Sequence, residues 1–256
     1  REIVWFTPPV ISAVTTTDVT DCNVPNGYIN VSASGVAPVQ YSADNGSTYF
    51  VDNNFYSLAA GNYTIVVLDA TGCSTTYTSN PAVINAPPPV LASSVTVTAN
   101  NICAGGIDGE ITITGVSGGA GGPFTYALDG LGSSRIFDLT SDPLIIDSLA
   151  AGNYDIVVMD KFGCESVIYP VVITEPSPIS INSLTIVDVV GCGSSGTGSI
   201  TASATGGTGT LSYWLDSIQN SPVTSGSWLG LPGGSYEVMV SDANLCNTVA
   251  QAQINA

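Results

Sequence analysis

The feature that most constrains this chain is a sixteen-residue signature that occurs three times. The copies read LAAGNYTIVVLDATGC at residues 58–73, LAAGNYDIVVMDKFGC at 149–164 and LPGGSYEVMVSDANLC at 231–246. Each copy contains turn residues, then an alternating apolar stretch typical of a strand, then a cysteine. Repetition of one strand-and-cysteine unit at this spacing predicts a tandem array of small β domains.

A second shared half lies upstream of each signature. A Thr/Val-rich stretch leads to a cysteine, a polar loop, a glycine and another alternating strand, in TTTDVTDCNVPNGYINVSAS, TVTANNICAGGIDGEITITG and TIVDVVGCGSSGTGSITASA. A Tyr-x-x-Asp motif follows at Tyr41, Tyr126 and Tyr213. Proline-rich segments separate the copies, and proline favours extended chain. We predict an out-of-phase N-terminal strand and linker, then three repeats, over residues 1–9, 10–88, 89–177 and 178–256.

The fold class follows from the spacing of apolar residues inside each repeat. Tyr63, Ile65 and Val67 share one face of a strand, and the other two signatures repeat the pattern. Period-two alternation with Gly/Asn/Pro turns predicts five to seven half-buried strands per repeat, and therefore an all-β rod of three immunoglobulin-like β-sandwiches. The tyrosine after Gly-Asn or Gly-Ser is typical of a tyrosine corner, which makes Tyr63, Tyr154 and Tyr236 structural residues.

Charge and composition exclude several classes of function. The chain has 3 Lys/Arg against 20 Asp/Glu, a net charge of −17, and no histidine. Nucleic acids and anionic membrane surfaces attract basic patches, so neither is an expected partner. The absence of histidine removes the commonest general base, and no Gly-rich stretch carries the lysine of a phosphate loop. No run of about twenty apolar residues predicts membrane insertion. We expect a non-enzymatic protein.

Six cysteines fall two per repeat. The repeat pattern favours one disulfide within each repeat, pairing Cys22 with Cys73, Cys103 with Cys164 and Cys192 with Cys246. A second interpretation links neighbouring repeats, Cys73 to Cys103 and Cys164 to Cys192. Either pairing indicates an oxidising compartment and a secreted, extracellular or cell-surface protein. The within-repeat pairing requires an even number of strands between the two cysteines, and the sequence leaves the count at four or five.

These motifs together resemble the SprB repeat family of Bacteroidetes surface proteins. The resemblance rests on Cys…Gly-x-Ile-x-Val, Tyr-x-x-Asp, Leu-x-x-Gly-x-Tyr-x-Val-x-Val-x-Asp and the closing Gly-Cys, and the third copy has Leu245 where Gly72 and Gly163 stand. It implies very large secreted adhesins, in some cases carried along the cell surface in gliding motility, and no enzymatic activity. In that phylum Asp-Ser/Thr-apolar is an O-glycosylation motif, which makes Ser148 and Ser217 candidate acceptors.

The start of the chain is out of phase with the repeats. REIVWFTPPVIS matches the end of a repeat, and its apolar run comprises Ile3, Val4, Trp5 and Phe6. An exposed strand of this kind needs a cover. We favour strand addition to a neighbouring copy, which gives a head-to-tail homopolymer. The alternatives are that the run finishes a preceding repeat of a longer array, or folds back on the first repeat.

Calcium is the one cofactor the sequence brings into consideration. Asp69 and Asp242 end signature strands, and Asp18 and Asp188 lie four residues before the first cysteine of their repeats. A within-repeat disulfide would bring these carboxylates together, and oxygen ligands suit Ca²⁺. Ala99 at the matching place in the second repeat, and the ordinary use of aspartate in turns, favour no metal.

The functional expectation is therefore structural. We predict a subunit of an extracellular or cell-surface filament. The alternatives are a stalk segment of a large secreted adhesin and a glycan-binding module that contacts surface glycans or other cells.

Overall fold

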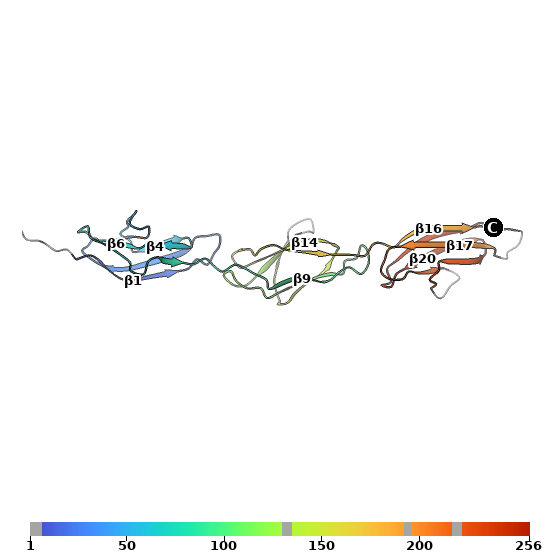
Figure 1. Ribbon diagram of the computed structural model, residues 1–256, viewed down its shortest axis with the longest axis horizontal. Helices are drawn as coiled ribbons and strands as arrows, with labels where there is room; N and C mark the ends of the chain where they lie inside the picture. Colours follow the sequence, from blue (N-terminus) through green and yellow to red (C-terminus); the bar gives the residue numbers. More distant parts are fainter. Residues whose placement is uncertain (1–6, 130–134, 192–195, 217–221) are drawn as a thin grey trace, which may run out of the picture. The chain divides into compact units, whose positions relative to one another are not determined.

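The computed structural model describes residues 7–129, 135–191, 196–216 and 222–256. Its colours in Figure 1 follow these residues from the N-terminus to the C-terminus. Every regular element in the described ranges is a β-strand, which confirms the all-β prediction. In the same ranges no helix is long and apolar enough to cross a membrane.

The first repeat contains eight short strands. They are β1 (Val10–Thr17), β2 (Gly27–Ser34), β3 (Gln40–Ser42), β4 (Asn54–Leu58), β5 (Gly61–Tyr63), β6 (Val66–Leu68), β7 (Ser74–Thr76) and β8 (Ala82–Ile84). They form sheets in the orders β1-β2-β4, β3-β6-β7 and β5-β8. Strands β5 and β6 continue one another along the signature, and β7 and β8 do the same beside them.

The second and third repeats show the same plan with longer strands. The second has β9 (Ser94–Ala99), β10 (Gly109–Thr114), β11 (Thr125–Asp129), β12 (Arg135–Asp138), β13 (Leu144–Leu149), β14 (Gly152–Met159) and β15 (Tyr169–Ile173). The third has β16 (Ser180–Val187), β17 (Gly198–Thr205), β18 (Ser212–Leu215), β19 (Ser227–Leu231), β20 (Gly234–Ser241) and β21 (Asn247–Ile254). The sheet orders are β13-β10-β9 and β12-β11-β14-β15, then β16-β17-β19 and β18-β20-β21.

The chain divides into two compact units. One holds the first repeat with residues 113–143 and 155–169, and the other holds residues 95–112, 144–154 and 170–256. The division passes through the second repeat. The repeat boundaries drawn from the sequence, after residues 88 and 177, therefore stay predictions.

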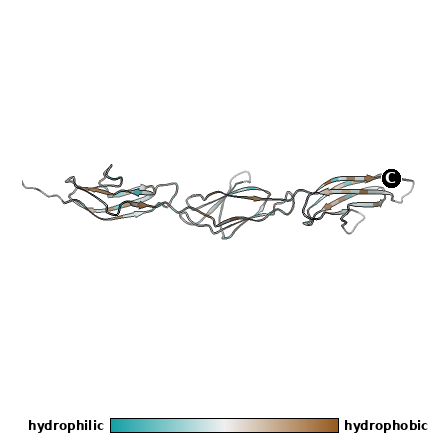
Figure 2. Cartoon of the chain, in the orientation of Figure 1, coloured by the Kyte–Doolittle hydropathy of each residue, from teal (hydrophilic) through white to brown (hydrophobic). Residues whose placement is uncertain are grey.

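The apolar faces predicted from period-two patterning form the cores of the first and third repeats. In the first repeat Ile29 and Val31 of β2 pack with Ile65 and Val67 of the signature, and all four are fully buried. In the third, Ile200 packs with Val238, Val240, Ile254 and their neighbours from both sheets. Figure 2 shows the corresponding hydrophobic stretches along the strands. Each such side chain contributes about 1.5–3 kcal/mol on burial, so these faces hold the sandwiches together.

The tyrosine corners predicted from the signature are present in all three repeats. Each hydroxyl donates to a backbone carbonyl four residues upstream, at 2.8–2.9 Å: Tyr63 to Ala59, Tyr154 to Ala150 and Tyr236 to Pro232. Tyr154 and Tyr236 are buried, and Tyr63 is half-buried. The hydroxyl bonds fix the bend that leads into the signature strand.

Strand direction decides at which end of a sandwich each cysteine lies. Strand β2 is antiparallel to β4, and β3 is antiparallel to β6. After β3 the chain runs back beside it, through the antiparallel bridge between Tyr41 and Phe50. The chain therefore crosses the first sandwich five times between Cys22 and Cys73: along β2, β3, the returning segment, β4 and β5–β6. An odd number of crossings places these two cysteines at opposite ends.

A glycine opens the second strand of each repeat because a side chain there has no space. A Cβ at Gly27 would lie 2.7 Å from the carbonyl oxygen of Leu58 and 2.8 Å from a methyl of Ile84. At Gly109 the same two distances, to Leu149 and Ile173, are both 2.7 Å. At Gly198 the distances to Leu231 and Ile254 are both 2.9 Å. The glycine lets two neighbouring strands close over the end of the core.

We predict that Gly198→Ala lowers the free energy of unfolding by about 1–3 kcal/mol, because the new methyl overpacks this site. Gly234→Ala in the same repeat is the matched control, since its Cβ meets nothing closer than 3.7 Å. Urea denaturation followed by Trp fluorescence measures both variants. Equal stability of the two would contradict the close approach described here.

Candidate functional site: the disulfide junctions between repeats

The turn after each signature strand has one architecture, and we call it the Asp-Cys turn (residues 69–73, 160–164 and 242–246). A buried aspartate opens it, and its Oδ1 accepts two backbone N–H bonds, one from the residue two positions on and one from the cysteine. The distances are 2.9 and 3.1 Å for Asp69, 2.9 and 2.9 Å for Asp160, and 2.9 and 3.0 Å for Asp242. Each aspartate N–H also donates to the cysteine carbonyl. The aspartate thus holds the cysteine in place.

The residue before each cysteine has a left-handed backbone, with φ of 81° at Gly72, 79° at Gly163 and 68° at Leu245. Glycine adopts this conformation without steric cost, whereas leucine does not. The one departure of the third signature from the repeat pattern is therefore a strained position. The third repeat keeps the same turn conformation at Leu245, because Asp242 accepts the same two backbone N–H bonds as Asp69 and Asp160.

Hydrogen bonds to the aspartates of the first two turns favour their ionised forms. The Thr71 hydroxyl is the largest influence on Asp69, and together with the Cys73 and Thr71 amides it lowers the pKa of that carboxyl. Burial opposes ionisation of Asp160. The amides of Ala120, Cys164 and Phe162 and the charge of Lys161 outweigh it, so the pKa of Asp160 is also lowered.

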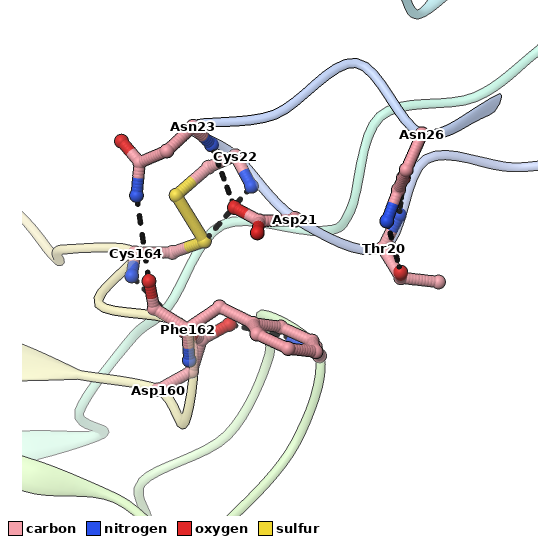
Figure 3. Close-up of a disulfide and its surroundings, with 9 residues drawn as sticks. Thr20, Asp21, Cys22, Asn23, Asn26, Asp160, Phe162 and Cys164 are labelled. Atoms are coloured by element: carbon pink, nitrogen blue, oxygen red, sulfur yellow. Dashed lines mark hydrogen bonds between the residues drawn. A yellow bond between two sulfur atoms is a disulfide. The ribbon is translucent and has the colours of Figure 1, made fainter. Parts of the chain in front are cut away.

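The first junction joins the Asp-Cys turn of the second repeat to the first repeat. Cys22 lies in the loop between β1 and β2, and it forms a disulfide with Cys164, with Cα atoms 5.7 Å apart. Figure 3 shows this bond and the polar contacts around it. The Cys22 N–H donates to the Cys164 Sγ at 3.2 Å, and the Asn23 side-chain amide donates to the Phe162 carbonyl at 3.4 Å.

The second junction repeats the first one repeat further along. Cys103 lies in the loop between β9 and β10, and it bonds Cys246 with Cα atoms 5.6 Å apart. A hollow beside the bond is lined by Pro176, Pro178 and Leu245. The Gly105 N–H donates to Glu175 of the linker at 2.6 Å. In both junctions the first cysteine of one repeat therefore bonds the second cysteine of the next.

The disulfide pairings predicted from the sequence are wrong. Cys22 does not bond Cys73, Cys103 does not bond Cys164, and Cys246 bonds Cys103 in place of Cys192. The second interpretation, Cys73 to Cys103 and Cys164 to Cys192, is wrong as well. In the first repeat the physical reason is the odd number of strand crossings, which separates Cys22 from Cys73 by the length of the sandwich. Cys73 has a free thiol and is partly exposed. Cys192 lies outside the described residues.

Several other predicted residues can be placed. Ser148 is exposed at the end of β13, has φ of 59° and donates to Asp147 at 3.1 Å, so its hydroxyl is on the surface. Ser217 and the apolar run Ile3, Val4, Trp5 and Phe6 fall outside the described residues.

The candidate calcium ligands bind backbone and side-chain amides. Asp18 accepts bonds from Asn85, and Asp188 from Asn255, at the equivalent place. In both cases the backbone amide is the main cause of a lowered carboxyl pKa. The premise that a within-repeat disulfide joins Asp18 to Asp69 is wrong, because no such disulfide forms. Asp69 and Asp242 accept the turn bonds described above, as turn aspartates do.

A cluster of Asp21, Cys22 and Cys164 is the one group of three potential metal ligands found in the described part of the chain. Both sulfurs are in the disulfide and carry no thiolate, so this cluster is a cross-link.

Comparison with known proteins supports the resemblance for part of the second repeat. Residues 95–133 match the model of the SprB repeat family. No curated protein matches the chain.

Among solved structures, the chain is similar to Sidekick-1 immunoglobulin domains 1–4, at 12% identity and TM-score 0.32, over 94% of this chain and 71% of that one. It is also similar to Sidekick-1 immunoglobulin domains 1–5, at 12% identity and TM-score 0.33, over 97% of this chain and 59% of that one. The similarity to fibronectin(III)-like modules of Clostridium thermocellum CbhA has 19% identity and a TM-score of 0.26, over 63% of this chain and 93% of that one. With TM-scores below 0.5, these likenesses add nothing to the strand pairings on which the immunoglobulin-like assignment rests.

We predict that acid weakens the Asp-Cys turns of Asp69 and Asp160, whose carboxyl pKa values are lowered. A carboxyl whose pKa is lowered by folding stabilises the native state above its unfolded pKa of about 3.9, and that contribution is lost as pH falls through the native pKa. Asp160→Asn should therefore lower the thermal midpoint at pH 7, and the difference from the unmodified protein should shrink below about pH 4. Calorimetry between pH 7 and pH 2 measures this, and a pH-independent difference would contradict it.

Proposed function

We propose that the protein is a structural subunit of an extracellular or cell-surface filament, assembled head to tail. The observation that carries the proposal is the pair of disulfides between successive repeats. A disulfide inside a domain stabilises that domain alone, whereas Cys22–Cys164 and Cys103–Cys246 connect each repeat covalently to the next at a second point. Such a connection serves a chain that must transmit tension.

The disulfides shorten the force-bearing path through the chain. The shortest covalent route runs to Cys22, across to Cys164, back along the second repeat to Cys103, and across to Cys246. Residues 23–102 and 165–245 lie off this route, so tension on the ends does not extend them. The arrangement limits how far the protein lengthens when its domains open.

The chemistry of the chain agrees with a structural role outside the cell. Structural disulfides persist in oxidising compartments. A net charge of −17 keeps a surface protein soluble and repels anionic partners. The junctions contain cross-links and turn aspartates, arrangements that stabilise structure, and we propose no catalytic activity and no required cofactor.

The proposed joint between subunits is the apolar run at residues 3–6. Its sequence matches the end of a repeat, and an apolar segment of this composition is suited to strand addition at the sheet edge of another copy. Because the donor and acceptor surfaces differ, such contacts add one subunit after another and build an open filament, not a closed ring.

The match of residues 95–133 to the SprB repeat favours a second candidate function. Repeats of this resemblance occur in very large adhesins, in which the protein would be a stalk segment that displays a binding region elsewhere. A glycan-binding module is a third class, and saturable binding of a polysaccharide would distinguish it from both.

We predict that the oxidised full-length chain forms filaments in negative-stain electron microscopy and that deletion of residues 1–9 abolishes them. Trp5→Ser/Phe6→Ser is the point-variant version, and Val83→Ser, at an exposed position of β8, is a control of similar chemistry. Filaments from the control and none from the other two would support strand addition. Unassembled particles from the intact chain would overturn the filament and favour the stalk.

We predict that reduction lengthens the protein under force. In single-molecule pulling from the two ends, the fully extended chain should gain about 550 Å when both disulfides are reduced, since about 160 residues at roughly 3.5 Å each join the path. The double variant Cys22→Ser/Cys103→Ser should show the long contour without reductant. Equal contours before and after reduction would contradict the pairing between repeats.

A further inference from the structure

The outer face of sheet β1-β2-β4 in the first repeat carries two tyrosines. Tyr28 on β2 alternates with the buried Ile29, so its side chain lies on the face away from the core. Tyr56 on β4 follows the buried Phe55, lies on the same face and is 65% exposed. The two ring centroids are 5.1 Å apart, and the ring planes are tilted by 40°. The rings therefore form one aromatic surface on the side of the sandwich.

An asparagine on β4 fixes the position of this surface. The Asn54 Oδ1 accepts hydrogen bonds from the Tyr28 hydroxyl and, at 2.8 Å, from the Asn30 side-chain amide. The Asn54 side-chain amide in turn donates to Asp52 Oδ1 at 2.8 Å. We call Tyr28, Asn30, Asn54 and Tyr56 the tyrosine face. Because these bonds and the paired strands hold Tyr28 and Asn30 in place, binding a ligand requires little reordering of the face.

Polar atoms at the edge of the tyrosine face are available to a ligand. No donor in the described part of the chain reaches Oδ1 of Asn30 or Oδ2 of Asp52. Strand β1 adds two exposed hydroxyls beside the face, at Thr15 and Thr17. An aromatic surface bordered by acceptors suits a ligand that has flat C–H surfaces and many hydroxyl donors.

The tyrosines are specific to the first repeat. Equivalent positions are counted from the glycine that opens the second strand and from the leucine whose carbonyl approaches it. Other residue types occupy the two positions in the other repeats, with Glu110 and Ser199 in place of Tyr28 and Asp147 and Leu229 in place of Tyr56. The sandwich therefore forms without tyrosine at these positions, and an exposed aromatic pair that the fold does not require indicates binding.

Charge distinguishes between neutral and acidic ligands. The described part of the first repeat, residues 7–88, contains no lysine or arginine, and the whole chain has a net charge of −17. Asp52 places a carboxylate at the border of the tyrosine face. These charges repel sugars that carry carboxylate, phosphate or sulfate groups. The ligand that matches this face in charge is therefore neutral.

A β-linked glucan combines the required properties. Its glucose rings carry their hydroxyls around the edge, which leaves a flat C–H surface above and below each ring. Such a surface stacks on a tyrosine ring, while the hydroxyls at the edge donate to amide and carboxylate oxygens. A proline-rich peptide also stacks on tyrosine, but it lacks the donors that the acceptors of Asn30 and Asp52 require.

We propose that the tyrosine face binds a neutral β-linked glucan, with glucose rings against Tyr28 and Tyr56. The glucan hydroxyls donate to Asn30 Oδ1 and Asp52 Oδ2. Because the face lies on the outer surface of a sheet, it fits an extended polymer that crosses the strands. The site adds a ligand to the structural subunit proposed above. It does not depend on head-to-tail assembly, since every residue involved belongs to the first repeat.

Calorimetric titration of the oxidised full-length chain with cellohexaose tests the site. Saturable binding is expected. Tyr56→Ala should weaken the affinity about tenfold, the effect of removing roughly 50 Å² of stacked apolar surface. Tyr56→Phe keeps the ring and should bind within about threefold of the unmodified protein. An unmodified chain that does not bind cellohexaose, or a Tyr56→Ala variant that binds it equally well, would overturn the proposal.

Leu229→Ala is the matched control, because Leu229 is 78% exposed at the position of the third repeat that is equivalent to Tyr56. Its affinity for cellohexaose should equal that of the unmodified protein, and a loss as large as that of Tyr56→Ala would contradict the site. Thermal unfolding verifies that each variant is folded. In NMR spectra, cellohexaose should shift amide signals of β2 and β4, and shifts confined to other strands would also contradict it.

Two further comparisons test the chemistry of the ligand. Carboxymethylcellulose should bind more weakly at low salt than hydroxyethylcellulose, a neutral polymer with the same backbone. A polyproline peptide should bind more weakly than cellohexaose. Tighter binding of the acidic polymer would overturn the assignment of a neutral ligand. Tighter binding of polyproline would overturn the glucan and indicate a proline-rich partner.

Electron microscopy of the same preparations separates this inference from the proposed filament. Filaments that bind no cellohexaose would overturn the glucan site and leave the filament standing. Unassembled chains that bind it through the tyrosine face would support the site and overturn the filament. Filaments that bind it through the tyrosine face would support both.

Discussion

An odd number of strand crossings separates Cys22 from Cys73 in the first repeat, and the connection of this repeat to the next depends on that constraint. Cys22 enters the first sandwich at one end and Cys73 leaves it at the other, because β2, β3, the returning segment, β4 and β5–β6 lie between them. A cysteine at the far end of a sandwich can reach only a partner in the adjoining repeat. The disulfides Cys22–Cys164 and Cys103–Cys246 follow from that placement.

The cross-links couple the folding of neighbouring repeats. Each closes a loop with a sequence separation of 142 or 143 residues, and the chain-entropy model assigns about 5 kcal/mol to a loop of that length. A bond inside one repeat would close a shorter loop and stabilise one domain. The turn aspartates make the bonds specific, since Asp160 and Asp242 fix the backbone around the cysteines that react.

The proposed structural function accounts together for several features of the chain. The cores consist of period-two apolar strands, the polar groups of the turns bind backbone amides, and the surface charge is strongly acidic. The two junctions place strong bonds where one domain meets the next. A protein that bears tension along its length uses cross-links at those positions.

The sequence by itself determined the all-β class, the buried faces of the strands and the tyrosine corners, because alternation and turn residues act over a few neighbouring positions. Tyr154 with Ala150, and Ile29 with Val31, are local relations of this kind. The sequence also located every cysteine. Only the tertiary structure decided which cysteines bond, because the answer depends on a single extra crossing between Tyr41 and Phe50 that is too short to recognise as a strand. One crossing more or fewer moves a cysteine from one end of the sandwich to the other, and residue order alone does not fix that parity.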